Sequence, residues 1–413
     1  MKNCIVGQSG GPTTAINASL CGVICEAAGN TFFDKVFGSL NGIEGILEEN
    51  IVDLTPLASG DDIDLLKITP ASFLGSCRKK LPSDLNDDIY KNIFKVFEKY
   101  NIGAFFYIGG NDSMDTVGKL SAYAEKTGSD IRIIGIPKTV DNDLPSTDHT
   151  PGFGSAAKYV SATIREIGID TSVYYLKSVT IVEIMGRDAG WLTAASSLAR
   201  SGNLKTPHLI YLPETTFDDD KFIDDINNLH KNGINSVVVA VSEGIRYADG
   251  CYVCEKAASV GSDNFGNKML SGTAKFLELL VKNRIGCKAR GIELNLPQRC
   301  AGHLLSKTDI DESFRAGAAA VNAAANGETS KMVCFKRISS SPYRCDVCCC
   351  DIKNALLPTT TVPSDWIENG NDVNGHFADY ASPLIQGEIT PVFEDGLPKY
   401  LCLKDLNLKK VKM

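Results

Sequence analysis

The sequence reads Tyr107-Ile108-Gly109-Gly110-Asn111-Asp112-Ser113 at the point that decides its fold. An apolar run over residues 104–108 leads into the two glycines, and apolar residues then recur at helical spacing from Met114 to Ala124. This order predicts a buried strand, a tight turn and a helix N-terminus. A second loop, Pro137-Lys138-Thr139-Val140-Asp141-Asn142-Asp143, follows another apolar run over residues 131–136. Both loops therefore leave the carboxyl ends of predicted strands, where open α/β sheets bind ligands.

The rest of the chain repeats this alternation of strands, glycine turns and helices. Cys4-Ile5-Val6 leads into a glycine loop and a small-residue helix, and the β-branched run Val179 to Ile184 leads into another loop. Strands that alternate with helices predict parallel, doubly wound sheets. Because 413 residues are too many for one ordinary domain, we expect an α/β protein of two Rossmann-like domains with mainly parallel sheets.

Composition limits the function classes. Hydrophobic residues make up 43% and charged residues 22% of the chain, which is ordinary for a soluble globular protein. A net charge of −8 argues against general binding to nucleic acid or to anionic membranes. The N-terminus lacks a signal-peptide pattern, and no apolar run reaches the length of a membrane span. Without an export signal, the 14 cysteines are interpreted as reduced thiols, so we expect a cytoplasmic protein.

The cysteines nevertheless gather in the last part of the chain. Cys345-Asp346-Val347-Cys348-Cys349-Cys350, together with Cys251 and Cys254, could supply four thiolates to a tetrahedral zinc site. Adjacent residues of a strand point to opposite faces, however, so these cysteines cannot all point one way. Buried reduced thiols are the favoured interpretation, and a structural metal is the alternative.

Glycine loops followed by carboxylates are typical of phosphoryl transfer. Paired glycines such as Gly10 and Gly11 let a backbone approach a ligand closely, and the helix that follows offers N–H groups to an anion. Phosphoryl transfer also needs a divalent cation held by carboxylates, and further cations for the phosphate oxygens. Asp112, Asp141 and Asp143 could supply the carboxylates. Each of these aspartates alone would suit a turn or a helix cap equally well.

The order of the motifs resembles the phosphofructokinase family, and within it the pyrophosphate-dependent members. The resemblance extends over roughly residues 4–335. The loop that ends at Asp143 and the Met185-Gly186-Arg187 motif are its most specific parts. The matching motifs are Gly10-Gly11, Gly75-Ser76-Cys77-Arg78, Gly109-Gly110-Asn111-Asp112-Ser113, Pro137-Lys138-Thr139-Val140-Asp141-Asn142-Asp143, Met185-Gly186-Arg187, Pro213-Glu214, Glu243-Gly244 and Gln298-Arg299.

The resemblance implies a phosphofructokinase fold and a Mg²⁺-dependent transferase of glycolysis or gluconeogenesis. This enzyme would move a phosphoryl group reversibly from pyrophosphate to the C1 hydroxyl of fructose 6-phosphate. Residues 1–152 with about 298–350 would form the pyrophosphate domain, and residues 153–297 with about 351–413 the sugar-phosphate domain. A homodimer or homotetramer is also implied, because better-known relatives complete the sugar-phosphate pocket with a neighbouring subunit.

The resemblance also assigns roles to single residues. Asp141 would be the general base that takes the proton of the C1 hydroxyl, a transfer usually worth about 10²–10⁴ in rate. Asp112 and Asp143 would hold Mg²⁺, which prefers carboxylates together with phosphate oxygens. Arg78 and Lys138 would act in catalysis. Pyrophosphate would be bound by Gly10, Gly11, Arg78 and Lys138, and the sugar phosphate by Thr139, Asp141, Met185, Gly186, Arg187, Glu243 and Arg290.

Two positions bear on the phosphoryl donor. ATP-using relatives have glycine where this chain has Asp112, and glycine again where it has Lys138. An aspartate adds bulk and a like charge against the α-phosphate of a nucleotide, whereas a lysine suits a short, highly charged diphosphate. Both residues favour pyrophosphate over ATP. The alternatives are an ATP-dependent enzyme of the same fold and a catalytically silent regulatory subunit, although a silent subunit has no need of Asp141.

Overall fold

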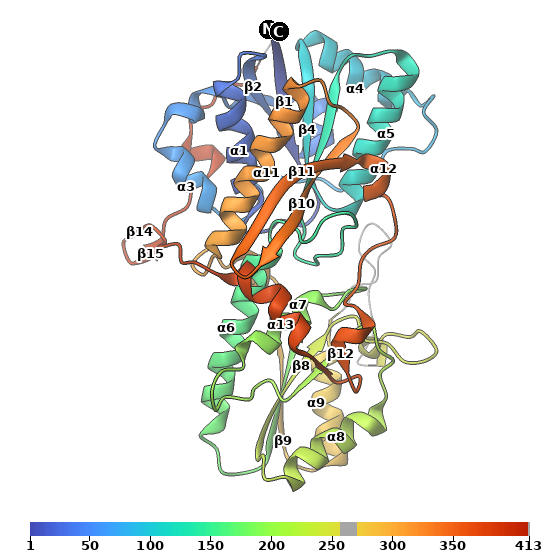
Figure 1. The fold of residues 1–413 in the computed structure, drawn as a ribbon, viewed down its shortest axis with the longest axis vertical. Coiled ribbons are helices and arrows are strands. Elements are labelled where there is room, and N and C mark those ends of the chain that lie inside the picture. The colour runs from blue at the N-terminus through green and yellow to red at the C-terminus, as the bar shows by residue number, and fades with distance from the viewer. Residues whose placement is uncertain (257–270, 412–413) are drawn as a thin grey trace.

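The computed structural model describes residues 1–256 and 271–411, which form two lobes, each built around its own β-sheet (Figure 1). The N-terminus lies at the end of the first lobe that is far from the second lobe (Figure 1). The first lobe contains β1 (Lys2–Gln8), α1 (Ile16–Gly29), β2 (Phe33–Ser39), α2 (Gly42–Leu47), β3 (Ile51–Asp53), the 3₁₀ helix η1 (Thr55–Ser59), α3 (Asp62–Ile68), α4 (Asp88–Lys99), β4 (Ile102–Gly109), α5 (Asn111–Thr127), β5 (Arg132–Pro137), α11 (Lys307–Ala325), β10 (Lys331–Ser340), β11 (Tyr343–Asp351) and α12 (Ile352–Ala355).

The sheet of the first lobe has the strand order β11-β10-β5-β4-β1-β2-β3. Its central strands are parallel, whereas β3 and β11 at the two edges run antiparallel to their neighbours. The central strands β4 and β5 are almost entirely buried because helices cover both faces. Side chains of α1 and α11 fill the core on one face, and side chains of α4 and α5 fill the core on the other.

The second lobe is smaller and has a four-stranded parallel sheet of order β7-β8-β6-β9. Apolar side chains of α6 pack on one face and those of α8 and α9 on the other. Its elements are α6 (Phe153–Ser172), β6 (Ser178–Ile184), α7 (Trp191–Ala194), η2 (Ala195–Ala199), β7 (Leu209–Tyr211), α8 (Asp219–Lys231), β8 (Ser236–Ser242), η3 (Val253–Lys256), α9 (Thr273–Arg284), β9 (Lys288–Glu293) and α10 (Pro297–Cys300). Both sheets bear out the predicted α/β class.

The segment after β11 passes from one lobe to the other and back. Phe377 of α13 lies in the core of the second lobe, as the division into domains implies. Leu401 lies in the core of the first lobe, and Val52 forms a β-bridge with Lys410. Both ends of the segment that the predicted division assigns to the second domain therefore contact the first lobe, since α12 also packs there. Its elements are η4 (Ser364–Trp366), β12 (Ile367–Glu368), β13 (Asp372–Val373), α13 (Gly375–Ala381), η5 (Ser382–Ile385), β14 (Phe393–Glu394), β15 (Leu397–Pro398) and η6 (Leu403–Asp405).

The connections position the predicted site. The loops that follow β1, β4 and β5 leave the carboxyl ends of parallel strands in the first sheet, and the loops after β6 and β8 do the same in the second. These two sets of loops meet between the lobes. Among the described helices, none combines the length and the apolar character that a bilayer crossing requires.

Candidate active site

A cavity of about 560 Å³ lies between the lobes, and residues of both line it. Two predicted site residues, Gly186 and Arg290, do not line this cavity. The other predicted residues come together here although they are spread over more than half of the chain. They are Gly10, Gly11, Arg78, Asp112, Lys138, Thr139, Asp141, Asp143, Met185, Arg187 and Glu243.

Lys138 reaches from the end of β5 to the glycine loop after β1. Its side chain is buried, with 2% of the residue exposed, and its Nζ donates a hydrogen bond to Gly11 O. Gly10 has a φ of +76°, and a Cβ there would lie 3.4 Å from Lys138 Nζ. Burial lowers the pKa of Lys138 to about 8, although the charge of Asp141 acts in the opposite direction. An anion bound beside the Lys138 ammonium would supply negative charge and so stabilise the protonated form of this buried lysine.

The N-terminus of α5 opens into the same cavity. Gly110 is the N-cap residue, and no side chain caps the first turn of the helix. An uncapped helix N-terminus attracts anions through its backbone N–H groups and its dipole. Asp112 lies in this first turn and pairs with Lys80 across 3.2 Å, and both side chains are exposed. The helix end therefore combines an anion-binding backbone with a carboxylate that is already paired with a lysine.

Asp141 and Asp143 both face the cavity because the residue between them has a left-handed backbone. Asn142 has a φ of +54°, a conformation that asparagine adopts more readily than most residues. Its buried side chain turns into the protein, where Oδ1 accepts a hydrogen bond from Thr150 N at 2.9 Å and Nδ2 donates one to Tyr380 Oη at 2.8 Å. The turn thereby places two carboxylates on one wall.

Three carboxyl groups of this cavity have raised pKa values and so hold their protons more tightly than usual. Burial raises the pKa of Asp141, although a hydrogen bond from Thr139 opposes the rise. Burial also raises the pKa of Asp143 to about 7, and the neighbouring charge of Asp141 adds to this effect. Burial raises the pKa of Glu243 to about 7 as well. Carboxyl groups whose pKa values are shifted towards neutrality are suited to general acid and base catalysis.

The donor atoms on this wall fit a hard divalent cation. Asp143 Oδ2 accepts a hydrogen bond from Asn111 Nδ2 at 2.9 Å, whereas its buried Oδ1 has no hydrogen-bond partner among the described residues. A carboxylate oxygen without a hydrogen-bond partner can coordinate a cation, and Mg²⁺ prefers oxygen ligands of this kind. The ligand atoms of Asp112, Asp141 and Asp143 do not all lie within 4.8 Å of one another. An ion here would therefore take other ligands from substrate oxygens and water.

The second lobe supplies the opposite wall. Met185 N donates a hydrogen bond to Gln298 Oε1 at 3.1 Å, and Gly186 N donates one to Glu243 Oε1 at 3.4 Å. Gly186 therefore does not line the cavity itself but holds the side chain of Glu243, which does. Arg299 reaches towards the first lobe, where a Cβ on Gly11 would lie 3.0 Å from Arg299 Nη1. The guanidinium therefore lies beside the glycine loop in the lining of the cavity.

The comparisons with known proteins agree with this geometry. A family model described as phosphofructokinase matches residues 3–324. The chain belongs to the phosphofructokinase family. It is 40% identical over 403 residues to a pyrophosphate--fructose 6-phosphate 1-phosphotransferase of Halomonas elongata, with 96% of this chain and 95% of that protein covered. A protein of the same name from Methylococcus capsulatus is 38% identical over 417 residues, covering 99% and 97% of the two chains.

A solved structure supports the same assignment. The crystal structure of a pyrophosphate-dependent phosphofructokinase from Nitrosospira multiformis superposes with a TM-score of 0.89 at 36% sequence identity. The match covers 100% of this chain and 98% of that one. The phosphofructokinase fold predicted from the sequence is therefore confirmed for the described residues, including those after Phe335, which carry none of the quoted motifs.

Several cavity residues of this phosphofructokinase are absent from the predicted site. The missed residues had signals of different strength. Lys79 and Lys80 continue the cationic run that begins at Arg78, which a solvated surface would explain equally well. Arg299 belongs to a motif that was recognised without a role, and Asn111 lies beside Asp112 in the loop before α5. The residues that line the cavity without having been predicted include Ser9, Lys79, Lys80, Asn111, Asp188 and Arg299.

Arg290 lies apart from the cavity of its own chain. It is exposed on β9, the edge strand of the second sheet. The family resemblance implies that it belongs to a sugar-phosphate pocket, which better-known relatives complete with a neighbouring subunit. A contact of Arg290 with the substrate therefore stays a prediction, and it requires a second copy of the chain.

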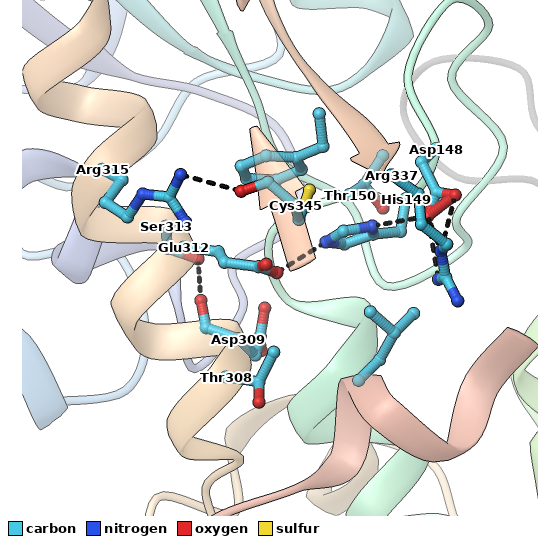
Figure 2. Close-up of polar contacts among 12 residues, drawn as sticks. Asp148, His149, Thr150, Thr308, Asp309, Glu312, Ser313, Arg315, Arg337 and Cys345 are labelled. Carbon is cyan, nitrogen blue, oxygen red and sulfur yellow. Dashed lines mark hydrogen bonds and ion pairs between the residues drawn. The ribbon is translucent and has the colours of Figure 1, made fainter. Parts of the chain in front are cut away.

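Behind the cavity wall, a buried ion network holds the segment that follows Asp143 (Figure 2). Asp148 accepts hydrogen bonds from Arg337 Nε at 3.0 Å and Nη2 at 2.9 Å. The ring of His149 lies between Asp148 Oδ1 at 3.0 Å and Glu312 Oε2 at 2.8 Å, and it stacks on Phe335. Burial alone would lower the pKa of His149, but the two carboxylates raise it to about 9. The imidazolium and its partners therefore anchor this loop to α11 and β10.

Proposed function

We propose that this chain transfers a phosphoryl group reversibly between pyrophosphate and the C1 hydroxyl of fructose 6-phosphate, giving fructose 1,6-bisphosphate and phosphate. The full-length relatives from Halomonas and Methylococcus are named for this reaction. The observation that carries the choice of donor is the position of Lys138, whose ammonium reaches Gly11 between the glycine loops. We further propose a cytoplasmic enzyme that requires Mg²⁺ and has no nucleic-acid or membrane partner.

Asp141 takes the proton of the C1 hydroxyl in this proposal. The oxygen then forms a bond to the terminal phosphorus of pyrophosphate, and the bond to the bridging oxygen breaks, which releases phosphate. Arg78 and Lys138 neutralise the transferred group, and the Gly10-Gly11 backbone approaches it closely. Asp112 and Asp143 would hold Mg²⁺, which when bound neutralises charge on the phosphate oxygens.

The sugar phosphate would lie against the wall formed by the second lobe. Glu243 accepts hydrogen bonds from sugar hydroxyls, while Met185 and Arg187 shape the pocket. Thr139 donates a hydrogen bond to a substrate oxygen. Because all four residues line the same cavity as Asp141, one bound sugar can contact them while its C1 hydroxyl faces the base.

The choice of donor is tested by assaying the purified protein with fructose 6-phosphate, Mg²⁺ and either pyrophosphate or ATP. We expect turnover with pyrophosphate and little or none with ATP. The pair Asp112→Gly and Lys138→Gly should lower the pyrophosphate rate and raise the ratio of ATP to pyrophosphate activity, because it removes bulk, a like charge and the ammonium. Asp115→Asn is the matched control, since Asp115 lies on the same helix, pairs with Lys119 and does not line the cavity.

Three outcomes would contradict the proposal. Product formed with ATP alone would make the chain an ATP-dependent enzyme of the same fold. Absence of product with either donor, from protein that is folded, would favour the silent regulatory subunit. An unchanged ratio of activities in the double variant would show that Asp112 and Lys138 do not select the donor.

We also propose that the active enzyme is a homodimer or homotetramer in which Arg290 serves a neighbouring site. The face near the end of α6 supports an assembly because it exposes consecutive apolar residues, including Val173, Tyr175 and Leu176. Isolated monomers rarely leave such a patch uncovered. Measurement of the mass in solution tests the assembly, and Arg290→Ala should raise the KM for fructose 6-phosphate.

A mixture of two defective variants tests whether Arg290 acts between subunits. Arg290→Ala protein keeps Asp141, whereas Asp141→Asn protein keeps Arg290. After the two variants are dissociated and reassembled together, hybrid dimers would contain one site with both residues, and activity should rise above that of either variant alone. No gain from hybrids of verified composition would show that Arg290 does not complete a neighbour's site.

A further inference from the structure

The thiols of the β10–β11 hairpin form a pair that the proposed reaction does not use. Cys334 of β10 and Cys348 of β11 are directly opposite one another in the antiparallel register, and their Sγ atoms lie 3.3 Å apart. Directly opposite residues in antiparallel strands have Cα atoms roughly 4.5–5.5 Å apart. A disulfide spans Cα separations of about 4.4–6.8 Å. The register thus brings the two backbones to a spacing that a disulfide can span.

The surroundings of the pair give the two sulfurs different tasks. Cys348 is exposed on the edge strand of the sheet, whereas only 5% of Cys334 is exposed. Cys350 shares a hydrogen bond with Cys334, and this bond lowers the pKa of Cys350 while it raises the pKa of Cys334. An oxidant in solution can therefore reach Cys348, whereas Cys334 is the sheltered partner whose proton lies in a hydrogen bond to Cys350.

A metal site explains these thiols less well. Among the residues that the structure describes, the one group that brings three metal-ligating atoms within 4.8 Å consists of His149, Glu312 and Cys345. Cys349 points to the opposite face of β11, where it packs against the core that contains α1 and α11. The run of cysteines is therefore divided between two faces of the strand, as the sequence predicted.

We propose that Cys334 and Cys348 are a modification site at which a hydroperoxide forms a reversible intramolecular disulfide. The Cys348 thiolate attacks the peroxide, so that an S–O bond forms, the O–O bond breaks, and the leaving oxygen takes a proton. Cys334 then loses its proton and attacks the Cys348 sulfenic acid, so that the S–S bond forms and the hydroxyl leaves as water. In sum, two thiols and one hydroperoxide give one disulfide, one alcohol and one water, or two waters when the oxidant is hydrogen peroxide.

The cross-link would join the edge strand β11 to β10 next to the segment that follows the catalytic loop. Phe335, the neighbour of Cys334, accepts a hydrogen bond from Asp148 N at 3.0 Å and donates one to Thr147 Oγ1 at 2.9 Å. A disulfide that closes this hairpin lowers the conformational entropy of the unfolded chain and so stabilises the folded state. The oxidised protein should therefore unfold at a higher temperature than the reduced protein.

The test treats the full-length, reduced protein with hydrogen peroxide in slight molar excess, blocks the remaining thiols, and maps the peptides without a reductant. We expect the mass of the protein to fall by that of two hydrogens. We also expect a linked pair of peptides that contain Cys334 and Cys348, and dithiothreitol should fully reverse the link. Cys348→Ser should abolish this linked pair and the rise in melting temperature. Cys402→Ser is the matched control, because Cys402 is exposed but lies outside the hairpin.

Three outcomes would overturn the proposal. One is the oxidation of Cys348 to a sulfinic acid while Cys334 stays reduced. Another is a disulfide that joins other cysteines in the wild-type protein and leaves Cys334 and Cys348 as thiols. The third is a stoichiometric zinc ion in the purified protein that protects these thiols from peroxide and is released by a chelator.

Discussion

The segment from Pro137 to Gly152 has two faces with opposite electrostatic character. The face towards the cavity carries groups whose charge is poorly matched: Lys138 has a lowered pKa, and Asp141 and Asp143 have raised ones. The face towards the protein interior is fully paired, since Asp148 binds Arg337 and His149 lies between two carboxylates (Figure 2). The difference shows which groups await a ligand and which only hold the loop that presents them.

The cavity face should respond most strongly to the loss of its base. Asp141→Asn removes the group that takes the proton of the C1 hydroxyl, and we expect kcat to fall by about 10²–10⁴ while fructose 6-phosphate still binds. Burial raises the pKa of Asp141, and the base must be ionised, so wild-type kcat/KM should fall as the pH decreases through that raised pKa. Steady-state kinetics between pH 5 and pH 9 measure both effects, as about this range keeps most proteins folded.

The residual activity of the Asp141→Asn protein provides the check. The fall of kcat/KM at low pH should disappear from its pH profile or move to another pH, because the titrating base has been removed. If the variant kept near-normal kcat with the same fall of kcat/KM at low pH, another group would be the base and the two faces of the segment would not differ in the proposed way.

The interior face should instead show its effect in stability. The pKa of His149 is raised to about 9, above the ordinary value of about 6.5. The folded state therefore binds this proton more tightly, so the contribution is complete below about pH 6.5 and is lost as the pH rises through about 9. We expect it to reach about 3 kcal/mol, with the loss seen as a smaller stability difference in urea between the wild type and a variant without His149 at pH 10 than at pH 7.

His149→Gln serves to isolate this contribution. The variant should be less stable than the wild type at pH 7, because Asp148 and Glu312 lose the cation between them, and the difference should shrink at pH 10. Lys138 changes stability in the opposite sense over this range, because its folded pKa of about 8 is lowered, but it does so in both proteins. A difference between wild type and variant that does not depend on pH would contradict a charged His149.

The two faces also differ in how far the sequence could predict them. Lys138 and Asp141 follow an apolar strand directly, so local pattern alone was enough to place them at the carboxyl end of a sheet. Tyr380 and Arg337 reach the same segment from more than 180 residues away, and no local period marks either as a partner. Their region carries none of the recognised motifs, and the structure was needed to show that it returns to the catalytic loop.

Arg299 and Arg290 teach a related limit. Both were recognised by their place in the chain, and only the structure distinguishes the one that reaches its own cavity from the one on an exposed edge strand. A sequence pattern does not report which chain a side chain will face. A sequence pattern also does not report the register of two paired strands. The pairing of Cys334 with Cys348 depends on that register, so the sequence alone does not predict it.

The smallest expected effect concerns the link between the two faces. Tyr380 Oη accepts a hydrogen bond from Asn142 Nδ2 and donates one to Asp148 O, both at 2.8 Å. Tyr380→Phe keeps the ring but leaves these groups unpaired, which costs about 1–3 kcal/mol for a buried group. Because Asn142 lies between Asp141 and Asp143, part of that cost should appear as a fall in kcat of about tenfold, with little change in the KM for fructose 6-phosphate.

Tyr343→Phe is the matched control for this prediction. Tyr343 also stacks on Arg337, but its hydroxyl donates to Glu312 Oε1 at 2.9 Å, on the far side of the network from the catalytic loop. It should lower the melting temperature as Tyr380→Phe does and leave kcat unchanged. If both variants lose stability and kcat in the same proportion, the hydroxyl of Tyr380 supports the fold in general. A fall in kcat confined to Tyr380→Phe would show that the interior face of the segment positions the carboxylates on the cavity face.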